Sequence, residues 1–296
     1  MRGLAGKGGP GKAEPFGGLA VCWRCFSLFG LAVLAIGFVL PIAILAIYSF
    51  FKDGRHGALI ADFTFNNYLS IISDRFYLQI LLETVWLGVM VASICALLAY
   101  PVAYHLTRTT PRVRGALIFM VLAPLTVSVV IRNLGWFPLL SQNGVINSLL
   151  MSTGLINQPL MLMNNFVGVL IGLVHALLPL MIMMLTNVFQ RVSPQLEEAA
   201  NNLGSSRMQL FLWVLLPLTL RGLAAGFLLV FTIAISSYTT PALMGGQRVL
   251  VMATFIDQQV HQMMRYASGS ALAVILLIVA LSITIYSNRQ LNKGAT

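Results

Sequence analysis

The chain has 296 residues, of which 58% are hydrophobic and 9% are charged. Soluble domains carry about 25% charged residues, so this composition excludes a soluble globular protein and predicts one that lies in a lipid bilayer. The formal net charge of +10 does not indicate a nucleic-acid partner, because the basic residues are scattered beside apolar segments and form no single stripe.

The apolar segments are continuous, which favours transmembrane helices over the short alternating strands of a membrane barrel. Runs of about 20 apolar residues mark six spans. The predicted spans are Phe26 to Phe51, Leu81 to Leu106, Gly115 to Leu140, Phe166 to Phe189, Leu215 to Thr239, and Ala267 to Tyr286. We therefore expect an all-α membrane protein with six transmembrane helices.

The segment before the first span contains a partial match to a nucleotide-binding loop. Residues 6–13 read GKGGPGKA, but Ala13 stands where a P-loop has the Ser or Thr that binds Mg²⁺. Cys22 and Cys25 have CxxC spacing without a second pair nearby, so we expect no metal site there. The apolar run that follows is too long for a signal peptide and predicts an uncleaved anchor. We expect residues 1–25 to form a flexible tail without a nucleotide site.

Lysine and arginine counts predict the orientation of the spans. Twelve Lys and Arg residues lie in the segments that six spans place on one side: the two terminal tails, the turn after the second span and the region around residues 190–217. Five lie in the loops on the opposite side. Arg132 lies inside the third span. The positive-inside rule therefore places both termini and residues 190–217 in the cytoplasm.

The polar stretch between the fourth and fifth spans carries the signals of a short helix. Ser193 can cap the helix and Pro194 suits its first position. Glu197 and Glu198 lie near the positive end of the helix dipole. Gly204 predicts the end of this helix.

A second helix is predicted directly after the first. Ser205 and Ser206 offer a cap, and the helix leads into the fifth span, where Pro217 predicts a bend. The two helices together would form an elbow with an exposed tip.

The exposed tip has the chemistry of a docking surface. Ala199 and Ala200 have little side chain to hold a partner away, and Glu198 can accept charge-assisted hydrogen bonds. The alternative is an amphipathic helix lying on the lipid, but such helices carry Lys and Arg on the polar face.

The spacing of this stretch resembles the EAA loop of type I ATP-binding-cassette (ABC) importer permeases. Glu198-Ala199-Ala200 is followed after three residues by Gly204, and after nine more by Val214-Leu215-Leu216-Pro217, with Val214 in place of the usual Ile. The resemblance implies a helix that docks into a cleft on an ATPase subunit. The residues to which it assigns this coupling are Glu197, Glu198, Ala199, Ala200, Gly204, Arg207 and Pro217.

Further segments resemble the spermidine/putrescine-type branch of these permeases. The matching segments are Phe63-Thr64, Asn67-Tyr68, Tyr100-Pro101-Val102-Ala103-Tyr104, Ile131-Arg132, Trp136, Leu178-Pro179 and Thr240-Pro241-Ala242-Leu243-Met244-Gly245-Gly246. The resemblance implies a permease domain over residues 80–287, preceded by a first span and periplasmic loop at 26–79 and followed by a cytoplasmic tail at 288–296. It also implies a bacterial inner-membrane assembly with an ATPase dimer that binds ATP and Mg²⁺, a second permease subunit that is often different, and a periplasmic substrate-binding protein.

Ionisable groups inside spans cost about 2.5–3.5 kcal/mol on insertion scales, so they are candidate pathway residues. Arg132 either lines the pathway or extends to the outer interface, and Glu83 either attracts a cation or is an interfacial carboxylate. His105 and His175 are interpreted as hydrogen-bonded packing residues. The candidate pathway residues are Glu83, Arg132, Trp136, Tyr238, Thr239 and Asp257.

Aromatic residues near the outer ends of spans have two interpretations. Their faces bind ammonium cations, which would suit a polyamine pathway. Aromatic belts at membrane interfaces have the same composition without any ligand. Small residues four apart, such as Gly168 with Gly172, Gly222 with Gly226, and Gly269 with Ala273, predict close helix packing.

The function that these features favour is ATP-driven import of a small polar solute by alternating access, with a polyamine as the substrate. Import of an aminophosphonate, an opine or iron by the same kind of machine is the alternative. An ion-coupled secondary transporter would need inverted repeats and a carboxylate relay, which the sequence does not show. A membrane enzyme is disfavoured because no metalloprotease or nucleophile motif is present.

Overall fold

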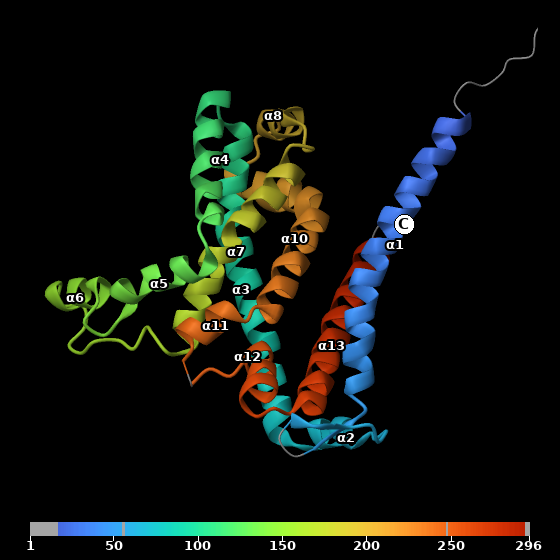
Figure 1. Ribbon diagram of the computed structural model, residues 1–296. Coiled ribbons are helices and arrows are strands. Elements are labelled where there is room, and N and C mark those ends of the chain that lie inside the picture. Colours follow the sequence, from blue (N-terminus) through green and yellow to red (C-terminus); the bar gives the residue numbers. More distant parts are fainter. Residues whose placement is uncertain (1–16, 55–56, 247, 294–296) are drawn as a thin grey trace, which may run out of the picture.

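The computed structural model describes residues 17–54, 57–246 and 248–293, and these are almost entirely helical (Figure 1). In chain order the elements are α1 (Gly17–Tyr48), β1 (Lys52–Asp53), β2 (Leu59–Ile60), α2 (Asn66–Ser73), α3 (Arg75–Arg108), α4 (Pro111–Thr126), α5 (Val129–Leu140), α6 (Val145–Ser152), α7 (Phe166–Phe189), α8 (Pro194–Asn202), α9 (Arg207–Gln209), the π-helix η2 (Leu210–Leu215), α10 (Leu216–Ser236), α11 (Thr239–Met244), α12 (Met252–Asp257), the π-helix η3 (Gln258–Gln262) and α13 (Tyr266–Lys293).

Five of the predicted spans are long apolar helices. They lie within α1, α3, α7, α9 to α10, and α13, and each is long and apolar enough to cross a membrane. Helix α7 has the bounds that the sequence predicts, whereas α1 begins at Gly17, upstream of the expected start at Phe26, because residues 19–25 contain neither Gly nor Pro. The partial match to a nucleotide-binding loop at residues 6–13 lies outside the described residues, and so do the side chains of Cys22 and Cys25.

The third predicted span is wrong as a single helix. Between α4 and the helices that follow it the chain bends by 97°, and α5 and α6 extend sideways from the bundle (Figure 1). The Thr126 hydroxyl donates to the carbonyl of Ala123 at 2.8 Å, which competes with helix propagation. Val127 and Ser128 then adopt extended backbone conformations. A count of apolar residues could not detect this bend, because hydrophobicity continues through it.

The core is the contact between α3, α7 and α10, which lie side by side in Figure 1. Its largest buried side chains include Leu87, Met181, Phe189 and Phe231. Glycines make the close approach of these helices possible. A Cβ on Gly222 of α10 would lie 2.2 Å from Cγ2 of Val188 on α7, so only Gly fits there.

At the opposite end from α8, residues of the first loop hold α13 in place. The β1–β2 hairpin presents Asp53, whose carboxylate accepts hydrogen bonds from the backbone N–H groups of Ala267 at 2.8 Å and Ser268 at 3.0 Å. This is an N-terminal cap supplied from a distant part of the chain. Helix α1 lies beside α13 and away from α3, α7 and α10 (Figure 1).

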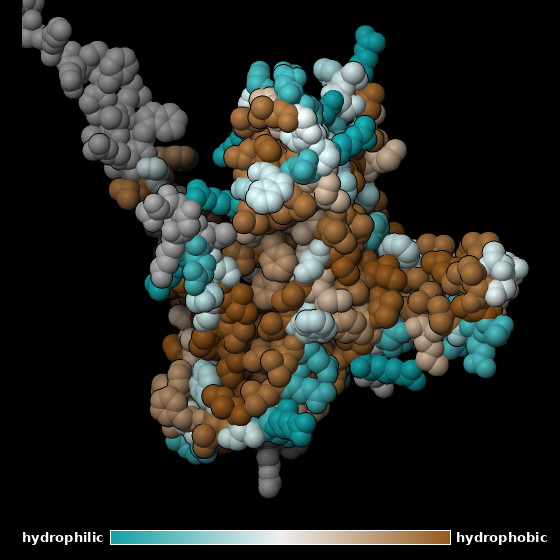
Figure 2. All heavy atoms as spheres, turned by 180° about the vertical axis from the view of Figure 1, so that it is seen from behind, coloured by the Kyte–Doolittle hydropathy of each residue, from teal (hydrophilic) through white to brown (hydrophobic). Residues whose placement is uncertain are grey.

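Apolar side chains remain on the outside of the bundle. In the view from behind, hydrophobic residues cover the middle of the molecule and hydrophilic ones gather at its upper end and along its lower edge (Figure 2). A band of this kind is typical of a protein surrounded by lipid.

Candidate functional site

The polar segment after α7 folds into the predicted short helix, α8. Ser193 occupies the N-cap position and Pro194 the first turn, although the Ser193 side chain makes no capping bond to the backbone. Gly204 follows the helix in a left-handed conformation, with φ +82°. The backbone N–H of Ser205 bonds to the carbonyl of Ala200 at 3.1 Å, and that of Gly204 bonds to Asn201 at 2.9 Å. This double closure is a Schellman motif, and glycine adopts its left-handed position without steric cost.

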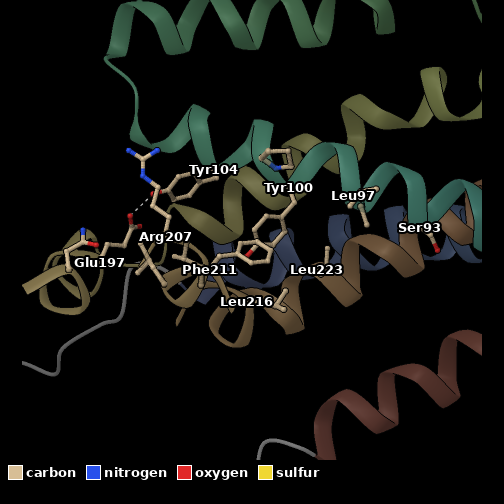
Figure 3. A pocket seen from close by; sticks show the side chains of 14 residues that line it. Ser93, Leu97, Tyr100, Tyr104, Glu197, Arg207, Phe211, Leu216 and Leu223 are labelled. Atoms are coloured by element: carbon tan, nitrogen blue, oxygen red, sulfur yellow. Dashed lines mark hydrogen bonds between the residues drawn. The ribbon is translucent and has the colours of Figure 1, made fainter. Parts of the chain in front are cut away.

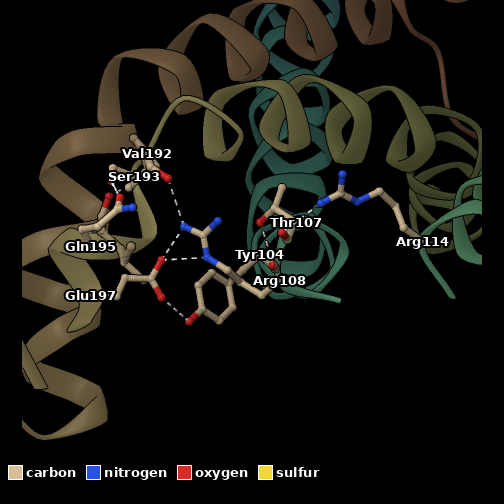
Figure 4. A network of polar contacts seen from close by, with 10 residues as sticks. Tyr104, Thr107, Arg108, Arg114, Val192, Ser193, Gln195 and Glu197 are labelled. Carbon is tan, nitrogen blue, oxygen red and sulfur yellow. Dashed lines mark hydrogen bonds and ion pairs between the residues drawn. The ribbon is translucent and has the colours of Figure 1, made fainter. Parts of the chain in front are cut away.

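Glu197 attaches α8 to the end of α3. Its Oε1 accepts from Nε of Arg108 at 2.8 Å and also from Nη2 of the same guanidinium, while Oε2 accepts from the Tyr104 hydroxyl at 2.8 Å (Figure 4). Arg108 Nη2 also donates to the carbonyl of Val192 at 3.2 Å. The side chains of Arg108 and Glu197 are 21% and 11% exposed. Because donors on α3 hold both carboxylate oxygens in a largely buried site, the contact restrains the position of α8 relative to α3.

The structure therefore gives the two glutamates different positions. We expected Glu197 to serve the docking surface together with Glu198, but Glu197 is buried against α3. Glu198 and Ala199 are exposed, Ala200 is half-buried, and Leu203 at the tip is 88% exposed. Adjacent residues of a helix point about 100° apart, so one of the pair faces α3 when the other faces outward. The exposed surface of α8 is what a partner could reach.

The second predicted helix begins as an α-helix, as expected, and then continues as a π-helix. Ser206 and Gln209 form a capping box, with the Gln209 side chain accepting from the Ser206 N–H at 2.8 Å. Arg207 is exposed at the start of this helix. The next turns form the π-helix η2, and Pro217 lies in the first turn of α10. The predicted bend at Pro217 is thus a change of helix type directly before the proline.

A cleft of about 900 Å³ lies between α3 and η2, beside the base of α8 (Figure 3). Tyr100 and Tyr104 line it from α3, Phe211 from η2, and Glu197 and Arg207 from its α8 end. Its walls are mostly apolar, and its volume shows that side chains do not fill all of the space between α3 and η2.

The candidate pathway residues of α5 form one group. The Trp136 Nε1 donates to Nδ1 of His175 on α7 at 3.3 Å, and the two rings meet edge to face at 5.4 Å. Arg132 donates through Nη2 to the carbonyl of Val127 at 3.0 Å, which closes the C-terminal end of α4. His175 is therefore a hydrogen-bonded packing residue as predicted, whereas His105 is exposed and the prediction for it is wrong.

A second group of candidate pathway residues lies just after the C-terminal end of α10. The Tyr238 hydroxyl donates to Oδ2 of Asp257 at 3.1 Å, and Nδ1 of His261 lies 2.8 Å from Oδ1. The hydrogen bond and the negative charge of Asp257 raise the pKa of Tyr238 above its ordinary value. Thr239 follows at the start of α11. Glu83 is exposed on α3, where it accepts from Gln79 at 2.8 Å. The structure thus brings Tyr238 and Asp257 into contact and places Arg132 and Trp136 on another helix.

Arg108 and Tyr104 were not recognised as functional residues from the sequence. The available signal was the pair of tyrosines in Tyr100-Pro101-Val102-Ala103-Tyr104, four residues apart and therefore on one face of a helix. That spacing predicts a shared face but gives no partner for it.

No family model matches the chain. The chain is 34% identical over 234 residues to the spermidine/putrescine transport system permease protein PotB of Escherichia coli (strain K12), covering 78% of the chain and 85% of that protein. It is 31% identical over 253 residues to PotB of Haemophilus influenzae, covering 84% and 88%. Among solved structures, a chain of a bacterial alginate ABC transporter in complex with its pentasaccharide-bound periplasmic protein matches with a TM-score of 0.74 at 16% identity, over 93% of this chain and 96% of that one.

Proposed function

The chain belongs to the spermidine/putrescine transport system permease family of ABC importers, and we propose that it lines the membrane pathway through which such an importer carries polyamines. One observation carries the mechanism: Arg108 and Tyr104 hold α8 through Glu197, while Glu198, Ala199 and Leu203 stay exposed on its other side. Because α8 is bound to α3 on one side and exposed on the other, a partner that displaces α8 also displaces α3.

In this proposal the partner proteins bind ATP and deliver the solute. A permease of this family is a transport subunit and works with an ATPase and a binding protein. In the proposed assembly, an ATPase dimer binds ATP and Mg²⁺ and receives α8 in a surface cleft. A second permease subunit completes the pathway, and we expect it to be a different chain. ATP-driven closure of the ATPase dimer shifts the membrane helices between two states, because its contacts with α8 differ between them.

The orientation follows from the charge distribution. The twelve Lys and Arg residues on the α8 side, against five on the other, favour a cytoplasmic α8 and cytoplasmic termini. The loops that contain Asp53 and Asp257 would then face the periplasm and meet the loaded binding protein.

Polyamine chemistry favours the group at Asp257. A protonated amine needs a carboxylate or an aromatic face, and Asp257 with the 44% exposed Tyr238 supplies both. Arg132 would repel a polycation, so we assign substrate contact to Asp257 and Tyr238 and not to α5.

Reconstitution in liposomes tests this function. The chain is co-expressed with the ATPase, the second permease subunit and the binding protein of its importer, and uptake of labelled spermidine and putrescine is measured with and without ATP. We expect ATP-dependent uptake that requires the binding protein. Uptake that follows an ion gradient without ATP would contradict the proposal and favour a secondary transporter, and uptake of iron, an opine or an aminophosphonate alone would contradict the substrate.

A further inference from the structure

Two tyrosines on α3 connect it to two different elements. Tyr104 donates to Glu197 of α8 (Figure 4). Tyr100, one helical turn away on α3, shares a hydrogen bond of 2.9 Å with the Thr219 hydroxyl of α10. Because residues four apart share a helix face, both connections leave α3 on the same side. Helix α3 therefore links α8 with α10 through side chains, in addition to the chain that runs from α8 through η2.

The direction of the Tyr100 bond follows from the second contact of Thr219. The Thr219 hydroxyl donates to the carbonyl of Leu215 at 2.7 Å, which uses its only proton. Tyr100 is therefore the donor and Thr219 the acceptor. Thr219 is 0% and Tyr100 8% exposed, so neither hydroxyl can exchange its partner for water without cost.

The bond lies where the fifth span changes helix type. Leu215 is the last residue of η2 and Thr219 belongs to the second turn of α10. Short π-helical segments often occur at functional sites, and the cleft of about 900 Å³ beside η2 leaves space for it to move. The Tyr100 ring also packs edge-on against Phe189 of α7 at 5.0 Å and Phe211 of η2 at 5.1 Å.

We propose that Tyr100 and Thr219 are positioning residues for transport: their hydrogen bond makes α10 follow α3 when α8 is displaced, while η2 is the joint that flexes. The inference rests on the proposed function. The displacement reaches α3 directly through Glu197 and Arg108, and α10 receives it at Thr219. Without the bond, η2 absorbs the displacement and α10 lags behind.

The test is the number of solute molecules imported per ATP hydrolysed by the complete importer in liposomes. Thr219→Val keeps the shape of the side chain and removes the hydroxyl. We expect the ratio to fall about two- to tenfold, the range in equilibrium that one hydrogen bond controls. Thr219→Ser restores the hydroxyl and should restore the ratio. Thr232→Val is the matched control, because the Thr232 hydroxyl donates to Leu228 within the same helix at 2.8 Å.

A second variant separates positioning from stability. Tyr100→Phe keeps the ring contacts and removes the donor, so it should lower the ratio as Thr219→Val does, and the double variant should lower it no further. A purely structural role would reduce ATP hydrolysis and import together, in proportion to the amount of assembled importer, and would overturn the inference. An unchanged ratio would also overturn it.

The proposed function fails in a different experiment. If the wild-type importer does not take up polyamine with ATP, the function is wrong whatever the variants do. If the wild-type importer takes up polyamine and Thr219→Val imports as many molecules per ATP as wild type, only the role assigned to Tyr100 and Thr219 is wrong.

Discussion

Arg108 and Glu197 join two parts of the chain that are 89 residues apart, with Nε and Oε1 at 2.8 Å. This ion pair attaches the helix that carries the docking surface to the end of the longest membrane helix. Transport, in the mechanism proposed above, depends on this attachment.

Glu197→Gln should destabilise the purified subunit. Removing one partner of a largely buried pair leaves the guanidinium without its counter-charge, and we expect a loss of about 2 kcal/mol, reduced from the fully buried case by the partial exposure of both side chains. Thermal unfolding in detergent measures it. Glu198→Gln makes the same chemical change on the exposed side and should leave stability unchanged, and equal losses in both variants would contradict the assigned positions.

Glu198→Arg should weaken binding of the ATPase. The substitution reverses a charge on the exposed surface of α8 without touching the tether at Glu197, so the subunit should fold and lose its partner. The amount of ATPase that co-purifies in detergent is the measurement. Glu83→Arg reverses an exposed carboxylate at the other end of α3 and should retain the ATPase, and retention by both variants would argue against docking on α8.

Gly222→Ala should disturb the contact between α10 and α7. The new Cβ would lie 2.2 Å from Cγ2 of Val188, and overpacking of this kind costs about 1–3 kcal/mol. Gly115→Ala is the matched control, because no atom lies within 4 Å of the position its Cβ would take. Thermal unfolding should distinguish the two, and similar midpoints would contradict the close helix approach.

Asp257→Asn should impair polyamine import at low substrate concentration. The change removes the negative charge but keeps a group that can accept from Tyr238, so the fold should persist while attraction for an ammonium group falls. Uptake by the reconstituted importer should show a half-saturating concentration raised by about tenfold, the equivalent of about 1.4 kcal/mol. Glu83→Gln removes the charge of an exposed carboxylate on α3 that the proposal does not place in contact with substrate, and it should leave uptake unchanged.

The ends of α8 could be predicted from the sequence, whereas the partners of its side chains could not. Its start at Ser193 and Pro194 and its end before Gly204 were predictable, because caps and left-handed glycines act on neighbouring residues of the chain. The presence of long apolar helices was equally predictable from composition. The predicted third span failed for the complementary reason: a bend at Val127 and Ser128 changes direction without changing hydrophobicity.

The sequence by itself determined that this protein lies in a lipid bilayer. It also determined most of the membrane helices and the helical elbow that resembles a coupling loop, since each of these depends on residues close together in the chain. Only the tertiary structure decided that Glu197 faces Arg108 while Glu198 faces outward, and that Tyr100 reaches Thr219, 119 residues away. These pairings depend on how α3, α7 and α10 pack, and a pattern along one segment contains no information on which segment will lie beside it.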